Sequence, residues 1–460
     1  MLTAEFTEAV DALIQDTSLP NNALNARARR YLKLVTDLQL RGPPWAARIQ
    51  TAIPKVPAFC TLQLIASLYA VADELKLVAG KRYVSATICV CGDRTIPAAM
   101  GAPEGQSITN LVQALDAIAS TWAAFLLWPF YVHGADRNLN SSPGDPQAFS
   151  SGPPPQNESE WVEKHQLVRD QQRREKEQVM ARDNYYCFMC GQYDTDWFFK
   201  QQPEPPDGAD FNDCDVVRII KREVLAQDEG CSLDGNSLNI MHGILKRYFS
   251  MNETLLEKAE GPRNMLFVNT SACTGFRKFQ WCLSPTKTPN RYKIKRYGPR
   301  NYAGSRHVTS CVSFVDHSQS LSPSQPPHPS PSPSRFQSQA RARAGRGIDT
   351  EPVDLPDPAL LRLHAALAGV LCLSGADLAF DCLLARPPWL PGCSRWPAPR
   401  GAAFWASVVE YEGEETCLEV DLDLSVEALL DDMRARAVAA GDYEARPAAT
   451  NSREGSPSRH

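Results

Sequence analysis

The stretch RDNYYCFMCG at residues 182–191 decides how the middle of this chain folds. Beyond it, the apolar run Asp215–Ile220 predicts a strand or the entry from a strand into a helix, and Ser237–Phe249 has helical spacing. Short strands are predicted at Lys278–Leu283 and Arg291–Tyr297. The middle of the chain is therefore expected to be mixed α+β.

Cys187 and Cys190 are the sharpest local chemical signal in that stretch. Two thiolates separated by two residues can hold one zinc ion, but a tetrahedral site needs two further ligands. The chain contains no second Cys-x-x-Cys pair, and the candidate partners, none at a recognised spacing, are Cys214, Cys231, His242 and Cys273. Ordinary buried or surface thiols are the alternative, and the sequence leaves both open.

A basic, aromatic segment follows at residues 261–306. Between Gly261 and Val315 there is no Asp or Glu, and tyrosine, tryptophan and phenylalanine alternate with lysine and arginine. Such a surface is typical of contacts with nucleic-acid phosphates. The residues predicted to make them are Arg277, Lys278, Arg291, Lys293, Lys295 and Arg296. The alternative is a solvated face, or one that balances the ten acids between Glu410 and Asp432.

Working outward, the composition divides the chain into segments with different expected structures. Residues 1–134 have helical apolar spacing, residues 135–158 form an Asn/Ser/Pro/Gly-rich linker, and residues 159–315 form the mixed domain. Within this mixed domain, Trp161–Met180 is dense in charge of both signs, which predicts a solvated helix. Residues 316–350 are a Pro/Ser/Arg-rich insert expected to be disordered, 351–437 a helical and then acidic segment, and 438–460 a disordered tail.

Overall composition excludes several classes of protein. The formal net charge of −5 gives no global attraction to nucleic acid. No apolar stretch follows a basic start, so an intracellular protein of the nucleus or cytoplasm is expected, not a secreted one. The most apolar run, Ile118–Val132, is too short to span a bilayer and predicts a buried helix, with no membrane contact. Fourteen cysteines then predict reduced thiols or metal ligands.

Four motifs in order resemble fungal HNH endonuclease-like proteins. RDNYYCFMCG at 182–191 is similar to that family's R-D-G-Y-R-C-x-x-T-G, and DVVRII at 215–220 to E-x-A-H-I-I. NMLFVNTSACTGFRKF at 264–279 is similar to N-G-x-x-L-x-x-x-x-H-x-x-F-D. Leu355–Ala376, LPDPALLRLHAALAGVLCLSGA, is similar to a C-terminal segment of the same proteins. The resemblance implies an α+β fold: a helical N-terminal region, a central ββα-metal core, and a C-terminal helical segment.

The resemblance also implies a chemistry that this chain lacks residues to perform. In the family a histidine acts as general base, and an acid and a later histidine hold Mg²⁺ or Mn²⁺. Here Arg218 occupies the position of the base, Cys273 that of the metal-binding histidine, and Arg277 that of the following Asp, whereas Asp215 and Asn264 are kept. Arginine cannot accept a proton near neutral pH.

The expected function is therefore that of an HNH nuclease-like protein with little or no phosphodiester hydrolysis. A divalent metal, Mg²⁺ or Mn²⁺, would be the cofactor of any remaining cleavage, and zinc at Cys187 and Cys190 is a separate prediction. The alternative is a non-enzymatic scaffold that binds nucleic acid or protein. The sequence does not distinguish DNA from RNA as the partner of residues 261–306.

Overall fold

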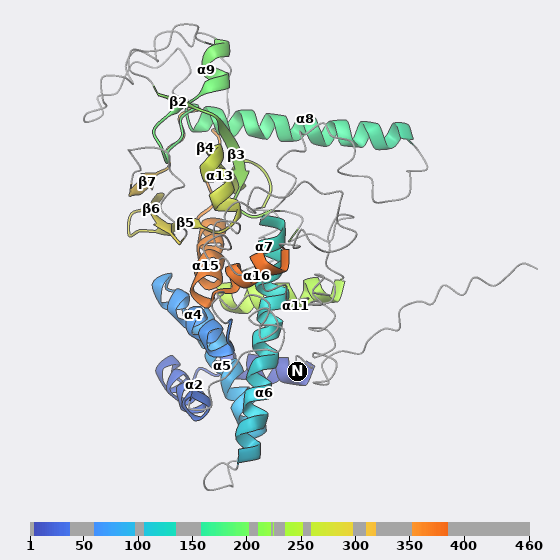
Figure 1. Cartoon of the computed structure of the whole chain (residues 1–460), viewed down its shortest axis with the longest axis vertical. Helices are drawn as coiled ribbons and strands as arrows, with labels where there is room; N and C mark the ends of the chain where they lie inside the picture. The colour runs from blue at the N-terminus through green and yellow to red at the C-terminus, as the bar shows by residue number, and fades with distance from the viewer. Residues whose placement is uncertain are drawn as a thin grey trace, which may run out of the picture. The chain divides into compact units, whose positions relative to one another are not determined.

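A computed structural model of the chain describes residues 4–36, 59–96, 105–134, 158–201, 210–221, 224, 235–251, 259–297, 310–318 and 352–384. The acidic stretch 410–432, the tail 438–460 and nearly all of the predicted linker and Pro/Ser/Arg-rich insert lie outside these residues. The described part combines many helices with small sheets (Figure 1). The α+β class expected from the sequence is confirmed.

The described chain falls into two compact units. The first unit takes in described residues up to 62 and from 82 to 124, and the second takes in 63–81 and 125–384. The N-terminal helices are α1 (Ala4–Gln15), α2 (Asn21–Thr36), α4 (Thr61–Glu74), α5 (Val78–Thr95), α6 (Gly105–Trp122), the π-helical turn η1 (Ala123–Leu127) and α7 (Trp128–Gly134). As predicted, this region is helical.

Arg82 organises the first unit. Its guanidinium donates hydrogen bonds to the carbonyl oxygens of Leu13 at 2.9 Å, Ile14 at 2.7 Å and Leu19 at 2.9 Å. These carbonyls lie at the end of α1 and just after it, where a helix leaves its last C=O groups without partners inside the helix. One arginine of α5 therefore holds the turn between α1 and α2.

The apolar run Ile118–Val132 belongs to a continuous helix longer than the run itself. The helix Gly105–Val132 has 28 residues and is long and apolar enough to cross a membrane by length and composition, so the expectation that the segment is too short was wrong. Of its most apolar window, 72% is buried inside the protein. Such burial is typical of a core helix, as the sequence predicted.

The second unit contains the strands and the remaining helices. The helices are α8 (Glu158–Arg182), α9 (Thr195–Gln201), α11 (Gly235–Phe249), the 3₁₀ turn η3 (Pro262–Asn264), α13 (Thr270–Arg277), α15 (Pro358–Ser374) and α16 (Ala376–Leu384). The strands are β1 (Tyr193–Asp194), β2 (Phe211–Asn212), β3 (Cys214–Arg218), β4 (Met265–Asn269), β5 (Trp281–Pro285), β6 (Arg291–Arg296) and β7 (Cys311–Ser313). They pair as parallel β1–β2, antiparallel β3–β4 and an antiparallel sheet β5–β6–β7.

α15 belongs to the core of this unit. Asp357 caps its start by accepting hydrogen bonds from the Ala359 and Leu360 N–H groups. Pro358 is the first residue of the helix, and Gly375, with a φ of 72°, caps its C-terminal end. The helix packs on β5 and is buried nearly all round. The C-terminal segment thus folds together with the mixed domain.

His364 shows how closely α15 joins that domain. Its ring stacks on Phe276 of α13 at 3.7 Å between centroids, and its Nε2 lies 3.1 Å from the Phe276 carbonyl oxygen. Complete burial lowers the pKa of His364 to about 3, so the ring is neutral. The residue packs between α13 and α15 and carries no charge at neutral pH.

Candidate functional site

The motifs at 215–220 and 264–279 form one ββα unit. β3 and β4 pair antiparallel with Asp215 opposite Val268 and Arg218 opposite Met265, and α13 starts directly after β4 (Figure 1). Asn269 starts the helix by accepting a hydrogen bond from the Ala272 N–H at 2.8 Å. Strand, strand and helix therefore follow in the order that the resemblance implies.

Asn264 fixes the connection between the two strands. Its Nδ2 donates to the carbonyl oxygens of Ile220 and Ala259, each at 2.7 Å, and its Oδ1 accepts from the Ile220 N–H at 2.9 Å. The side chain is fully buried, so nothing but the backbone satisfies its amide. This arrangement makes Asn264 a positioning residue of the loop that follows β3.

Cys273 and Asp215 come together on this unit. The Cys273 Sγ lies 3.6 Å from the Asp215 carbonyl oxygen and 3.5 Å from that of Val268. Burial and the Asp215 carboxylate raise the pKa of the Cys273 thiol to about 12, against the smaller lowering effects of Arg277 and Lys176. The residue in the metal-ligand position is therefore a protonated thiol at neutral pH, whereas the hard cations Mg²⁺ and Mn²⁺ take oxygen ligands.

Asp215, which the resemblance assigns to the metal, is held by a lysine of α8. The Lys176 Nζ lies 2.7 Å from the Asp215 Oδ1, and the same oxygen accepts a hydrogen bond from the Val216 N–H. Both side chains are close to half exposed. An ammonium group thus stands against the only carboxylate that the resemblance offers to a divalent cation.

Arg218 is held by Glu175, the residue of α8 that precedes Lys176. Its Nη2 lies 3.2 Å from the Glu175 Oε2, and Glu175 is 8% exposed. Side chains alternate along a strand, so Asp215 and Arg218, three residues apart, leave opposite faces of the β3–β4 pair. Arg218 shares its face with its cross-strand neighbour Met265, which packs against Val179 of α8. The positions of base and metal-binding acid therefore point apart.

α8 carries these contacts although its sequence predicts a solvated helix. Most of its described side chains are exposed, but Glu175 and Val179 near its end are buried against β3 and β4. The charge pattern of α8 does not indicate this burial, because β3 and β4, the strands on which α8 packs, lie about 40 residues or more away in sequence. The contacts that Glu175 and Lys176 make with β3 were therefore not predicted from the sequence.

Cys187 and Cys190 lie in a tight hairpin beside the start of β3. The Asn269 N–H donates to the Cys187 Sγ at 3.2 Å, and Cys187 also hydrogen-bonds with the thiols of Cys190 and Cys214. Of the other candidate ligands, Cys231 lies outside the described residues and His242 lies on α11. Within the described ranges, no group of three His, Cys, Asp or Glu side chains is already arranged around a metal.

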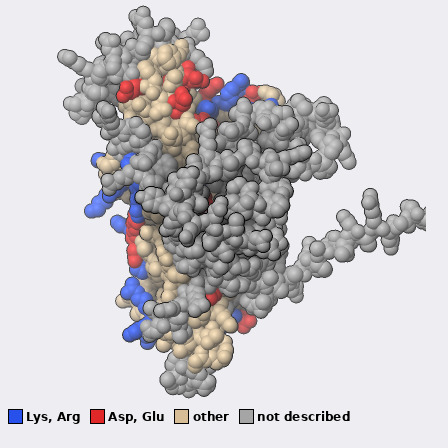
Figure 2. Space-filling model, viewed as in Figure 1, with Lys and Arg blue, Asp and Glu red and all other residues tan. Residues whose placement is uncertain are grey.

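The predicted nucleic-acid residues separate into two groups. Arg291, Lys293 and Lys295 alternate along β6 with the buried Tyr292 and Ile294, so their side chains share the outer face of the sheet. Figure 2 shows Lys and Arg gathered at the edge where Figure 1 places β6 and β7. Arg296, also exposed, ends the strand. We call Arg291, Lys293 and Lys295 the β6 surface, because Arg296 belongs by the same alternation to the other face of the strand.

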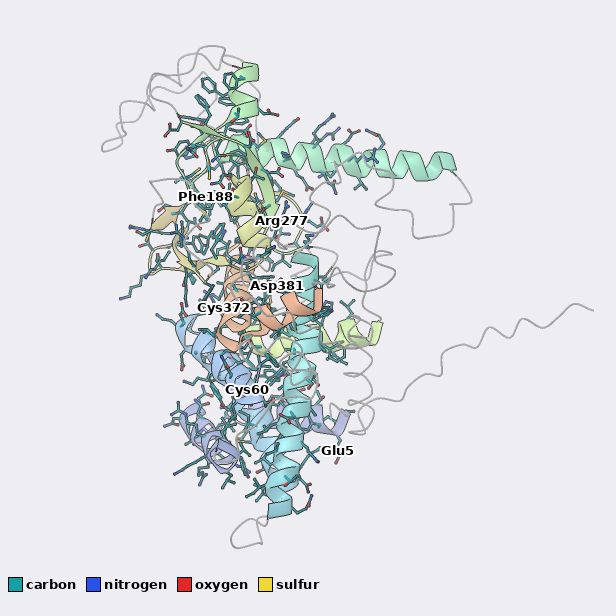
Figure 3. All side chains as sticks on the ribbon, in the orientation of Figure 1. Glu5, Cys60, Phe188, Arg277, Cys372 and Asp381 are labelled. Atoms are coloured by element: carbon teal, nitrogen blue, oxygen red, sulfur yellow. The ribbon has the colours of Figure 1, made fainter. Side chains whose placement is uncertain are left out.

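The predicted residues differ in how accessible their charges are. Lys295 is paired with Glu74 and lies 5.0 Å from the centre of the Tyr297 ring, so its charge is partly neutralised. Arg277 and Lys278 lie at the end of α13 and are half-buried, and Figure 3 shows Arg277 beside that helix. Among the predicted residues, Arg291 and Lys293 therefore offer the most accessible charge.

Aromatic contacts tie the cysteine hairpin to the β6 sheet. Phe188, labelled in Figure 3, meets Phe314 edge to face at 5.3 Å, and Phe314 in turn lies 5.7 Å from Tyr292. Edge-to-face pairs at this spacing contribute beyond the area that they bury. The hairpin and the β6 sheet are thus parts of one packed region.

Comparison with known proteins adds no assignment: no protein-family model, no curated protein and no solved structure matches this chain.

Proposed function

We propose that this chain is an HNH nuclease-like protein that binds nucleic acid and does not cleave it. The observation that carries the proposal is the pair of contacts from α8: Glu175 on Arg218 and Lys176 on Asp215. These two charges engage the two side chains on which base and metal chemistry would depend. Among the predicted contact residues that the structure describes, those of the β6 surface are available to a nucleic acid.

The residues present do not fit a catalytic Mg²⁺ or Mn²⁺ ion. Such hard cations take oxygen ligands, and Mn²⁺ also accepts imidazole, whereas the second candidate position holds the protonated thiol of Cys273. Asp215 would have to exchange Lys176 for the metal. Arg218 in the position of the base cannot take a proton from water. The site therefore lacks the residues that a cleavage step would need.

Binding of nucleic acid by the β6 surface is supported by its spacing and its neighbours. Residues two apart on a strand are about 6.8 Å apart, so Arg291 and Lys293 can meet two separate phosphates. Across the strand pairs, Arg291 faces Ser313 and Lys293 faces Ser284, which offer hydroxyl groups rather than competing carboxylates. Contacts of this kind read the backbone and give little sequence preference.

Incubation of the full chain with supercoiled plasmid and either Mg²⁺ or Mn²⁺ is expected to give no nicked or linear product. The physical reason is the absence of a proton acceptor and of a free carboxylate at the ββα unit. Gel analysis of the plasmid measures this, and Asp215→Asn is the matched variant, because it removes only the carboxylate charge. Robust nicking that disappears in Asp215→Asn would overturn the proposal.

Reversing the charge of Arg291 and Lys293 together is expected to weaken binding of a short single-stranded DNA or RNA by at least about tenfold at moderate salt. The slope of log affinity against log salt should fall by about 1 to 2, because two phosphate contacts are lost. Fluorescence anisotropy over a salt series measures both quantities. Arg173→Glu, on an exposed residue of α8, is the control and should change binding little.

Two outcomes decide between the competing functions. Equal loss of affinity in Arg173→Glu would mean that net charge, and not the β6 surface, drives binding. If neither DNA nor RNA binds at low salt, the proposal fails and the protein-binding scaffold becomes the favoured function.

A further inference from the structure

The Cys187–Cys190 hairpin has a backbone geometry that brings its two thiols to one side. Gly191 has a φ of 73°, a left-handed conformation that glycine adopts without strain, and a Cβ there would meet the Tyr186 hydroxyl at 2.9 Å. The Gly191 N–H donates to the Cys187 carbonyl at 2.9 Å, and the Cys187 N–H donates to the Gln192 carbonyl at 2.9 Å. The turn is therefore tight and closed by its own backbone.

A third thiol lies against this turn. Cys214 is the first residue of β3, opposite Asn269 of β4, and Cys187 hydrogen-bonds with the thiols of both Cys190 and Cys214. The three cysteines come from positions up to 27 residues apart in sequence, and only the fold brings them together. Cys187 is fully buried, Cys190 is 4% exposed and Cys214 is partly exposed.

Two N–H groups of Asn269 are directed at the Cys187 sulfur. The Asn269 backbone N–H donates to the Cys187 Sγ at 3.2 Å, and the Asn269 Nδ2 lies 3.8 Å from the same atom. A neutral thiol is a weak acceptor, whereas a thiolate accepts N–H groups strongly. Donors aimed at a ligand atom are the usual second layer of a metal site, where they orient the ligand and stabilise its charge.

From this arrangement we propose that Cys187, Cys190 and Cys214 together bind one thiophilic divalent cation, namely zinc. With Zn–S bonds of about 2.3 Å, neighbouring sulfurs of a tetrahedral site lie about 3.8 Å apart. Two of the three sulfur pairs, Cys187 with Cys190 and Cys187 with Cys214, are already in hydrogen-bonding contact. Binding also requires Cys190 and Cys214 to reach that spacing, because the described residues contain no ready-made group of three metal ligands.

The ion would join the hairpin to β3. Each bound thiol gives up its proton, so the S–H contacts of Cys187 are replaced by bonds to the metal. Because β3 carries Asp215 and Arg218, the ion would also fix the strand from which these side chains extend. Its role would be structural, and it does not depend on whether the chain binds nucleic acid.

Metal content of the full-length protein, expressed with zinc in the medium and dialysed against metal-free buffer, tests the proposal directly. About one equivalent of zinc per chain is expected, measured by atomic spectrometry. Cys187→Ser and Cys214→Ser should each lower the zinc content by more than half, and Cys282→Ser, a buried cysteine of β5, should not. Less than half an equivalent in the unaltered protein would overturn the proposal, and normal zinc content in Cys214→Ser would remove Cys214 as the third ligand.

A second measurement uses only the unaltered chain, so it holds even if a variant fails to fold. Protein stripped of metal is titrated with Co²⁺, which takes the place of zinc in thiolate sites. An intense near-ultraviolet band from sulfur-to-cobalt charge transfer, saturating at one equivalent and lost when excess zinc is added, is expected. Absence of that band would count against thiolate ligation.

Discussion

Replacing Arg182 with methionine should lower the free energy of unfolding by about 3–5 kcal/mol. Arg182 is fully buried at the end of α8. Its guanidinium holds the Asp183 carboxylate through two hydrogen bonds of 2.9 and 2.8 Å. Without it, Asp183, itself 9% exposed, would remain as a charge without its partner.

The same guanidinium also joins three separate segments. It donates to the carbonyl oxygens of Pro262 at 2.9 Å, Met265 at 3.0 Å and Asp354 at 3.1 Å. The methionine side chain has a similar length but no donor, so these carbonyls would lose their partner inside the protein. α8, the start of β4 and the segment before α15 should therefore loosen together.

Urea denaturation followed by tryptophan fluorescence measures the loss. Arg263→Met is the matched control, because Arg263 pairs with Asp354 at 2.7 Å but is exposed, and its removal should cost less than about 1 kcal/mol. If Arg182→Met and Arg263→Met cost the same, the buried arginine does not connect these segments as described.

Asn264→Ala should lower the free energy of unfolding by about 2–4 kcal/mol. The change removes three hydrogen bonds and leaves the Ile220 N–H and the Ile220 and Ala259 carbonyl oxygens buried without a partner. Asn264→Asp should be nearly as harmful, because a carboxylate would face two carbonyl oxygens to which the amide donated. The same denaturation experiment applies to both variants.

The control for Asn264 is a second asparagine with one side-chain contact. Asn212 donates to the Gln192 Oε1 at 2.8 Å in a partly exposed position, so Asn212→Ala should cost about 1 kcal/mol or less. Because Asn264 acts through the backbone of its loop, any fall in nucleic-acid affinity in Asn264→Ala should follow the loss of folded protein. A variant of full stability that no longer binds would contradict this positioning role.

Local sequence signals predicted several elements well, because their causes are local. β6, Arg291–Arg296, matches the expected strand since alternation of charged and apolar residues requires one buried face. The strand expected at Lys278–Leu283 instead begins at Trp281, because Phe279 has a φ of 57° and the chain turns there. Strand boundaries depend on such single backbone conformations, which residue types only weakly specify.

By itself the sequence determined the α+β class, and it placed Arg218 and Cys273 at the two positions where the resemblance implies histidines. The tertiary structure alone decided what surrounds those positions. Glu175 and Lys176 meet Arg218 and Asp215, and Cys214 meets Cys187, across roughly 30 to 40 residues of sequence. Contacts between residues so far apart in sequence depend on how α8 and the hairpin pack on β3. Such packing is a property of the whole fold rather than of any local pattern.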